Sequence, residues 1–114
     1  MIARVWRGWT AIDDAESYVD YLVATGMKDS RATPGNRGVL VLRRAADGRA
    51  EFTTVTFWET LDAIDAFAGP DREKAVFYPD DERFLVEREW AVAHHDVVHA
   101  ELAGPMTPRG EPNG

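Results

Sequence analysis

The sequence predicts an α+β fold in which an antiparallel four-stranded sheet carries helices on one face. Its 114 residues suffice for one domain with a single core. Segments with strand composition and segments with helical periodicity follow one another in the order β-α-β-β-α-β. A strong turn signal, Asp47-Gly48, separates the two central strand segments. This order is that of the ferredoxin-like arrangement.

The first strand and the first helix are predicted from residue type and spacing. Residues 2–9 are rich in β-branched and aromatic side chains, which is typical of a strand. Thr10 or Asp13 is expected to cap the following helix, because an acidic residue stands three positions after each. The helix is expected to run to about Met27, with Gly26 at its C-terminal end. Its apolar positions at helical spacing are Ala15, Tyr18, Val19, Leu22 and Val23.

A β-hairpin is predicted in the middle of the chain. Residues 38–44 and 51–58 have the composition of strands, and residues 30–37 before them are expected to form a loop. The two strands are joined through Asp47-Gly48, where glycine takes a positive φ at no steric cost.

The last part of the chain is predicted as a broken helical region and a closing strand. Thr60 is expected to cap a helix that ends at Gly69, and its apolar positions are Leu61, Ile64, Phe67 and Ala68. Residues 71–78 are expected to form a short helix and residues 80–86 one more turn. Residues 88–99 suit either a strand or a helix. A strand is preferred, because the sheet would otherwise keep an unpaired edge.

Composition excludes several classes of function. The 13 basic and 20 acidic side chains give a net charge of −7, which argues against nucleic acid as a partner. The absence of cysteine excludes disulfides, cysteine-based metal sites and a thiol nucleophile. No signal segment and no apolar run of ~18 residues is visible, so we expect a cytoplasmic protein without a membrane partner.

Residues 1–102 are expected to form the domain, and the Pro/Gly-rich residues 103–114 a flexible tail.

The strands predict a symmetric homodimer. Val39 and Val41 alternate with Leu40 and Leu42, so both faces of the sheet are apolar. A chain of this length has no segment left to cover the second face, and two copies packed face to face would cover it. The alternative is a monomer whose second sheet face is solvated.

One segment resembles a known family. Residues 57–60, Phe-Trp-Glu-Thr, are followed by the apolar spacing of residues 61–67. This passage is similar to the strand-to-helix signature of antibiotic biosynthesis monooxygenase (ABM) domains, which belong to the dimeric α/β-barrel superfamily. The resemblance covers residues 1–100. It implies a pocket between sheet and helices, and cofactor-free oxidation of phenolic polycyclic substrates to quinones, in which the substrate supplies the electrons.

Haem-degrading members of the same family give a second comparison. Their motif has a Trp on the second helix, a His ligand ten residues later and an Asn on the first strand. Phe67 and Phe77 stand at the matching positions here, and no Asn precedes Asn36. Because Phe cannot ligate iron, the resemblance predicts neither haem degradation nor any other cofactor.

The histidines lie within six residues of one another, and His94 is predicted as a catalytic general base. Imidazole titrates near neutral pH, which suits removal of a proton from a phenol or enol. The alternative is a structural histidine at a strand end or subunit interface. On a strand, His95 and His99 would be ~13 Å apart, too far to share a metal ion. A helix would bring them together, but no metal site is expected.

Aromatic residues are predicted to bind the substrate. Trp6 and Trp58 are expected as walls of a slot for a flat molecule, together with Phe67 and Phe77. Tyr78, at a helix end, is expected to donate a hydrogen bond to a substrate oxygen. The alternative for the rings is packing in the core and the dimer interface, and for Tyr78 a half-buried position at the rim.

Charged residues receive structural roles at this level. Arg4 and Arg7 face opposite sides of the first strand. A buried arginine there would bind a substrate carboxylate or pair with an acidic residue such as Glu59, and pairing is preferred. The acidic run Asp80-Asp81-Glu82 is expected to be a solvated helix start.

Two functions follow from these observations. The preferred one is a cofactor-independent monooxygenase acting on a small aromatic or polyketide-like substrate. The alternative is a non-catalytic dimeric module of the same fold that binds a small molecule or serves in a stress response.

Overall fold

The computed structural model describes residues 1–106 and 108. Its strands are β1 (Ile2–Ala11), β2 (Asn36–Ala46), β3 (Arg49–Trp58), β4 (Leu85–Arg88) and β5 (Ala93–Asp96). Its helices are α1 (Ala15–Leu22), α2 (Lys28–Ala32), α3 (Leu61–Ala68) and α4 (Asp81–Phe84), with a 3-10 turn at Ile12–Asp14 and a π turn at Val23–Met27. Residues 107 and 109–114 of the predicted tail lie outside the described residues.

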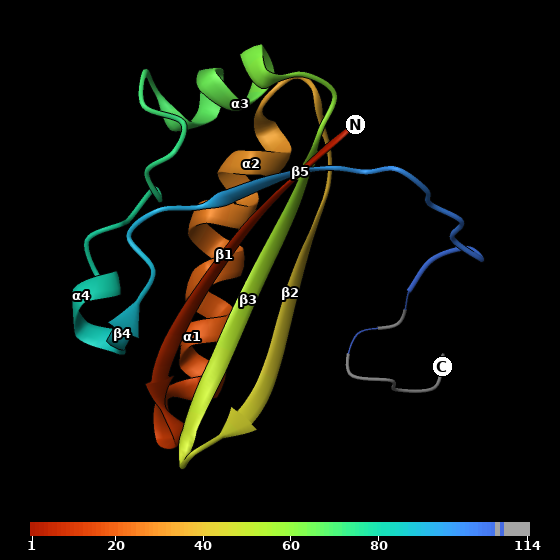
Figure 1. Cartoon of the computed structure of the whole chain (residues 1–114). Coiled ribbons are helices and arrows are strands. Elements are labelled where there is room, and N and C mark those ends of the chain that lie inside the picture. The colour runs from red at the N-terminus through yellow and green to blue at the C-terminus, as the bar shows by residue number, and fades with distance from the viewer. Residues whose placement is uncertain (107, 109–114) are drawn as a thin grey trace.

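The sheet is antiparallel, with the strand order β2-β3-β1-β4, and β5 also pairs with β1. Helices α1 and α2 cross one face of it (Figure 1). This arrangement confirms the predicted α+β class and the helices on one face. The long ladder between β1 and β3 runs from Ile2 opposite Trp58 to Ala11 opposite Arg49.

Of the closing strand predicted over residues 88–99, mainly β5 forms, and a second short strand, β4, begins earlier, in the segment predicted as a helical turn. Both β4 and β5 pair with β1, but the residues between them leave the sheet edge. There the Ala75 N–H donates to the Trp90 carbonyl at 3.0 Å, and the Val92 N–H donates to the Glu73 carbonyl at 2.9 Å. The helix predicted over residues 71–78 is therefore wrong, because this segment uses its backbone groups in a β-bridge.

The first helix also differs from the prediction at both ends. Thr10 does not cap it, because its hydroxyl donates to the Ala11 carbonyl at 2.9 Å. Asp13 lies inside the 3-10 turn, where no side chain caps the helix. At the other end, the helical path continues past Gly26 to Ala32 through the π turn.

The hairpin and the second helix follow the prediction. Asp47 and Gly48 both have positive φ, 54° and 74°, as a two-residue hairpin turn requires. The Thr60 hydroxyl accepts the Ala63 N–H at 3.1 Å and caps α3, and Gly69 ends it with a φ of 85°.

The core lies between the sheet and helix α1. Alternate residues of β3 are buried against the helices, as the pleat of a strand requires. Tyr18 of α1 is fully buried and meets Phe52 edge to face, with ring centroids 5.1 Å apart. Trp6, Leu22 and Phe84 complete this cluster.

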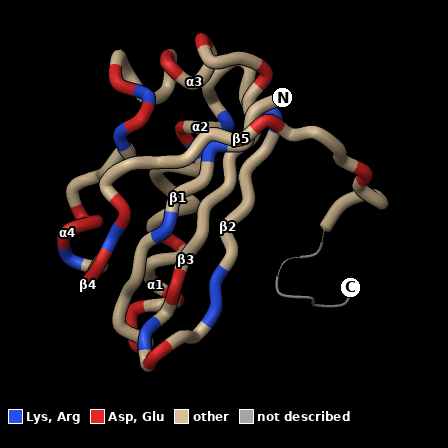
Figure 2. Tube along the Cα trace, viewed as in Figure 1, with Lys and Arg blue, Asp and Glu red and all other residues tan. Residues whose placement is uncertain are grey.

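Charged residues lie mainly on the surface, and many of them are paired. Figure 2 shows basic and acidic residues interleaved along the strands and around α4. Arg43 pairs with Glu16, and Arg49 pairs with Glu87. Within the described part of the chain, no helix has the length and hydrophobicity needed to cross a bilayer.

Candidate functional site

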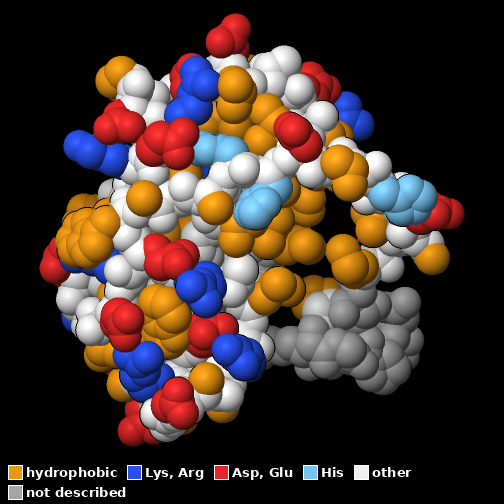
Figure 3. Space-filling model, viewed as in Figure 1, with side chains coloured by type: hydrophobic (Ala, Val, Ile, Leu, Met, Phe, Trp, Pro, Cys, Tyr) orange, Lys and Arg blue, Asp and Glu red, His pale blue; other side chains and the backbone are white. Residues whose placement is uncertain are grey.

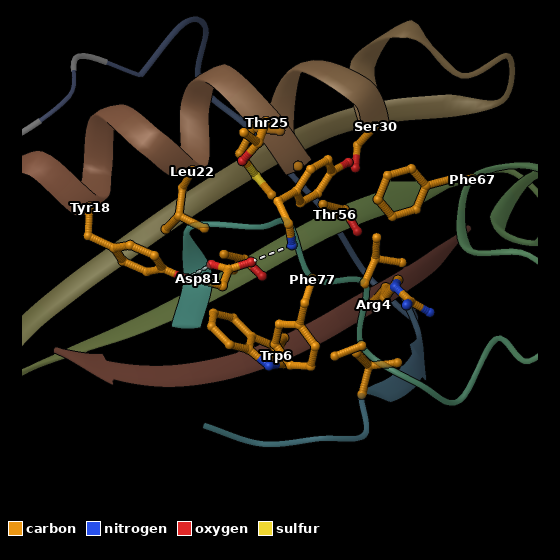
Figure 4. A pocket seen from close by; sticks show the side chains of 17 residues that line it. Arg4, Trp6, Tyr18, Leu22, Thr25, Ser30, Thr56, Phe67, Phe77 and Asp81 are labelled. Atoms are coloured by element: carbon orange, nitrogen blue, oxygen red, sulfur yellow. Dashed lines mark hydrogen bonds between the residues drawn. The ribbon is translucent and has the colours of Figure 1, made fainter. Parts of the chain in front are cut away.

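A pocket lies between the sheet and the π turn of the first helical segment, and residues 75–78 close it from the side (Figure 4). Its cavity volume is about 60 Å³. One water molecule needs ~15 Å³ on this scale, so the cavity has room for about four. This space is too small for a fused polycycle.

Strand β1 supplies the floor of the pocket through its residues that face the helices. Trp6 forms a wall, and its indole N–H donates to the Glu89 carbonyl at 2.7 Å. Gly8 makes room for this ring, since a Cβ at Gly8 would lie 2.3 Å from a ring carbon of Trp6. Phe77 stands edge to face against Trp6 at a centroid distance of 6.1 Å. The two rings therefore form a fixed corner.

The π turn supplies the opposite side. Its extra residue per turn widens the helix where Thr25, Gly26 and Met27 line the pocket. The Thr25 hydroxyl donates to the Tyr21 carbonyl at 2.7 Å, a bond from a side chain to the backbone one turn earlier. Such turns occur frequently at functional sites.

Arg4 is a buried cation at one end of the pocket, with 5% of its surface exposed. Its guanidinium donates to the carbonyls of Arg72 at 2.5 Å and Lys74 at 2.9 Å. Burial lowers the pKa of Arg4 to about 10, and the charge of Glu73 opposes this shift. The group is therefore still charged at neutral pH.

The expected ion pair of this arginine is wrong. Within residues 1–106 and 108, Arg4 has no carboxylate within ion-pair distance. Glu59 pairs with Arg37 instead, at 2.9 Å. On the other face of β1, Arg7 pairs with Glu89 at 2.9 Å. Arg4 thus presents a buried charge to the pocket that the described chain leaves without a counter-ion.

His94 lies behind Arg4 and is not among the residues that line the pocket. Its Nε2 is 3.0 Å from Arg4 Nη1, and it must accept this bond because arginine only donates. His94 is therefore neutral, with its proton on Nδ1, which lies 3.8 Å from Glu73 Oε1. Burial and then the charge of Arg4 lower the pKa of His94.

Asp81 is a buried carboxylate on the pocket wall, 4% exposed. It accepts the Tyr18 hydroxyl at 2.8 Å and the Tyr78 N–H at 2.8 Å. The prediction of a solvated helix start is wrong here, because the turn before α4 brings this residue beneath α1. Its neighbours Asp80 and Glu82 are exposed, as expected.

The carboxylate also acts on its tyrosine partner. Burial and then the charge of Asp81 raise the pKa of Tyr18 far above its usual value, so the hydroxyl stays protonated and donates. In the part of the chain that is described, Asp81 has no ion-pair partner. Figure 4 shows Arg4 and Asp81 on opposite sides of the rings of Trp6 and Phe77.

The structure brings most of the predicted binding residues together. Trp6, Phe67, Phe77 and Tyr78 all line the pocket. Trp58 does not line it. It is fully buried beneath Phe67 at a centroid distance of 5.7 Å.

Tyr78 points its hydroxyl towards the helices rather than into the cavity. It donates to Asp29 Oδ2 at 2.6 Å, and burial and then this bond raise the pKa of Tyr78. The phenol is therefore already engaged as a donor in the unliganded chain.

Sequence reasoning missed several polar residues of the pocket wall. Asp81 and Thr25 carried no local signal of a site. Ser30 is fully buried, and its hydroxyl has no hydrogen-bond partner among the described residues. The alternation of β1 and β3 could have placed Thr56 beside Arg4, because the two residues stand opposite each other on the helix-facing side.

Comparison with protein families identifies the relationship. The family model described as antibiotic biosynthesis monooxygenase (ABM) matches residues 1–76, two thirds of the chain. The chain belongs to this family. A search of curated proteins finds no match.

Solved structures of ABM-type proteins share the fold. A Bacillus cereus protein assigned to the antibiotic biosynthesis monooxygenases has a TM-score of 0.64 at 14% identity, over 92% of this chain and 98% of its own. A Nitrosomonas europaea protein with the same assignment has a TM-score of 0.60 at 17% identity, over 87% and 100%. The heme-degrader MhuD from Mycobacterium tuberculosis has 0.55 at 19%, over 89% and 100%. At these identities the likeness concerns the fold.

Because MhuD binds haem, we asked whether the pocket of this chain could hold one. None of the lining residues is a histidine, and the tyrosine hydroxyls of Tyr18 and Tyr78 are bonded to carboxylates. The cavity of about 60 Å³ is also far smaller than a porphyrin. These residues do not fit a haem.

Proposed function

We propose that this protein is a monooxygenase that oxidises a small aromatic or polyketide-like substrate, with the substrate itself supplying the electrons. One observation carries the proposal. The pocket combines aromatic walls with two buried charges, Arg4 and Asp81, and neither has an ion-pair partner among the described residues. Charges held away from water act strongly on a bound molecule. Membership of the ABM family supports the oxygen chemistry.

The proposed reaction converts an activated CH₂ group of the substrate to a carbonyl. Asp81 accepts a proton, and Arg4 stabilises the resulting enolate or phenolate. This anion passes electrons to O₂ and forms a C–O bond. The peroxide then loses water, so one oxygen atom stays in the carbonyl and the other leaves with two hydrogens. The carbon loses four electrons and O₂ gains four, so no external reductant is required.

His94 is the alternative base that the sequence predicted. Its Nε2 lone pair faces Arg4 rather than the cavity, and Asp81 is therefore preferred as the proton acceptor. In this proposal His94 positions the guanidinium. If Asp81 is the base, Asp81→Asn loses the chemical step. If His94 is the base, His94→Gln loses it.

The test is oxygen uptake with a panel of phenols and enols that range from one ring to anthrone. Wild type should consume one O₂ per carbonyl formed. Asp81→Asn should lower kcat by ~100-fold or more, because a general base contributes on this order. The exposed neighbour provides the matched control, Asp80→Asn, which should keep the wild-type rate, and His94→Gln should keep most of it.

Each other outcome has a defined meaning. If Asp81→Asn keeps the rate while His94→Gln loses it, the base is His94. If wild type consumes no oxygen above the uncatalysed rate with any member of the panel, the proposed enzymatic function is rejected.

A binding module without turnover is the second candidate. Trp58 and Phe67 pack against each other between β3 and α3, and the cavity beside them is small, which favours this alternative. A ligand that binds with a defined stoichiometry but is recovered unchanged under oxygen would support it.

We also propose that the protein is a homodimer. Val5, Val55 and Leu40 lie in register across the sheet face turned away from α1 and α2. Figure 3 looks onto this face and shows hydrophobic side chains near its centre. Leu42, on the same face, is 50% exposed in the single chain.

Light scattering after gel filtration tests this assembly. Wild type should have twice the chain mass of 12.7 kDa. Val55→Glu should be monomeric, whereas the control Val23→Glu, on the helical side and 55% exposed, should stay dimeric. A monomeric wild type at micromolar concentration would reject the dimer.

A further inference from the structure

The guanidinium of Arg4 has an unused edge. Arginine carries five N–H donors in a fixed plane. Nη1 donates to the Arg72 carbonyl and to His94, and Nη2 donates once, to the Lys74 carbonyl. Nε–H and one N–H of Nη2 have no partner in residues 1–106 and 108. These donors belong to a side chain that is 5% exposed and lines the pocket.

Other arginines of this chain show what that edge binds. Arg72 holds Asp65 through Nε at 2.8 Å and Nη2 at 2.6 Å. Arg44 holds Glu51 through Nε at 2.8 Å and Nη2 at 3.3 Å. In both pairs the two nitrogens bind the two oxygens of one carboxylate. On Arg4, Nε has no partner in the described chain, and Nη2 keeps one N–H besides the one that it donates to Lys74.

The donors that Arg4 does use fix the guanidinium in place. Two backbone carbonyls and the lone pair of His94 hold it from one side, so little side-chain freedom remains to be lost when a ligand binds. The carboxylate of the pocket, Asp81, is held by Tyr18 and Tyr78 at other points of the wall. Arg4 is therefore free to pair with a carboxylate of a bound ligand.

We propose that the pocket binds a small aromatic carboxylic acid, whose carboxylate lies on the Nε/Nη2 edge of Arg4. The planar fork of arginine matches two carboxylate oxygens, whereas a phenolate offers only one. The aromatic ring lies against Trp6 and Phe77, and the cavity volume of about 60 Å³ is too small for a fused polycycle. This inference rests on the proposed function, since it names the substrate class of the same site.

The hydroxyl of Ser30, on the pocket wall, could form a hydrogen bond with a substituent on that ring. The hydroxyl of Ser30 is fully buried, has no partner among the described residues and points into the pocket from the helical side (Figure 4). Arg4 reaches the same space from the sheet. A hydroxyl or carbonyl group on the acid, opposite the carboxylate, would satisfy Ser30.

Calorimetric titration with benzoate and with its neutral analogue benzamide tests the inference. Wild type should bind benzoate at least tenfold more tightly than benzamide. Arg4→Gln should reduce this ratio to about one. The matched control Arg44→Gln removes the same charge from an exposed ion pair and should keep the ratio. In ¹H–¹⁵N spectra, benzoate should shift the Nε–H resonance of Arg4.

Wild type alone can overturn the inference, so it does not depend on the folding of a variant. Equal affinity for benzoate and benzamide, or no binding of either, rejects it. Arg4→Lys supplies a second check, because it keeps the charge and loses the fork. It should lose most of the tenfold preference while its circular dichroism spectrum matches that of wild type.

The outcome is separable from that of the proposed function. Preferential benzoate binding without oxygen uptake on any member of the panel supports the carboxylate site and rejects the oxidation. Oxygen uptake on neutral enols, with no preference for acids, supports the oxidation and rejects the carboxylate site.

Discussion

Replacing Tyr18 by phenylalanine removes one oxygen atom from the most deeply buried polar contact of the site. The hydroxyl is 2.8 Å from Asp81 Oδ1, and its loss leaves the buried carboxylate with the Tyr78 N–H alone. A hydrogen bond to a charged group contributes ~1.5–3 kcal/mol, and the ring still packs on Phe52. We expect the free energy of unfolding to fall by about 2 kcal/mol. The melting temperature should fall by roughly 10 °C.

Urea unfolding followed by circular dichroism measures this loss. Tyr21→Phe is the matched control on the same helix, because the Tyr21 hydroxyl accepts the N–H of Asp80 in an exposed loop. It should cost about 0.5 kcal/mol. If Tyr18→Phe costs no more than Tyr21→Phe, the buried contact does not stabilise the fold as argued.

The same variant has a signature at alkaline pH. Because burial and Asp81 raise the pKa of Tyr18, the folded state keeps a proton that the unfolded state releases above pH ~10. Wild-type stability should therefore fall as the pH rises above this value. In Tyr18→Phe this part of the decline should be absent.

Three further predictions concern the surroundings of the pocket and one helix cap. Because burial and Arg4 lower the pKa of His94, the unfolded state binds more protons than the folded state below pH ~6.5. The free energy of unfolding should therefore decrease as the pH is lowered from 7 to 5. His94→Gln should flatten this decrease, as measured by urea unfolding at each pH. Gly8→Ala should cost ~1–3 kcal/mol by displacing the Trp6 ring, seen as a changed near-UV circular dichroism spectrum. Thr60→Ala should cost ~1 kcal/mol through loss of the helix cap, and an unchanged urea midpoint would contradict this.

Features that depend on neighbouring residues could be predicted from the sequence. The hairpin turn at Asp47-Gly48 and the helix from Thr60 to Gly69 are set by local φ preferences and a local cap. The alternation of β1 likewise places Arg4 and Trp6 on one face, and both line the pocket.

Features that depend on distant residues could not be predicted. Asp81 meets a tyrosine 63 positions earlier, and Arg4 is held by groups 68 to 90 positions later. Residues 71–78 have a helical composition, but their backbone pairs with the segment after β4. The spacing of neighbouring residues predicts neither the burial of Asp81 nor the absence of an ion-pair partner for Arg4. Both arise only when the sheet packs against the loop between α3 and α4.

Mapping bound benzoate by ¹H–¹⁵N chemical shifts tests most directly the central claim that the pocket between sheet and helices is the ligand site. The account predicts the largest backbone shifts at Arg4, Gly26, Met27 and Ala75, which surround the cavity. Shifts that instead gather on the uncovered sheet face around Val55 would place the ligand outside the pocket and contradict the account.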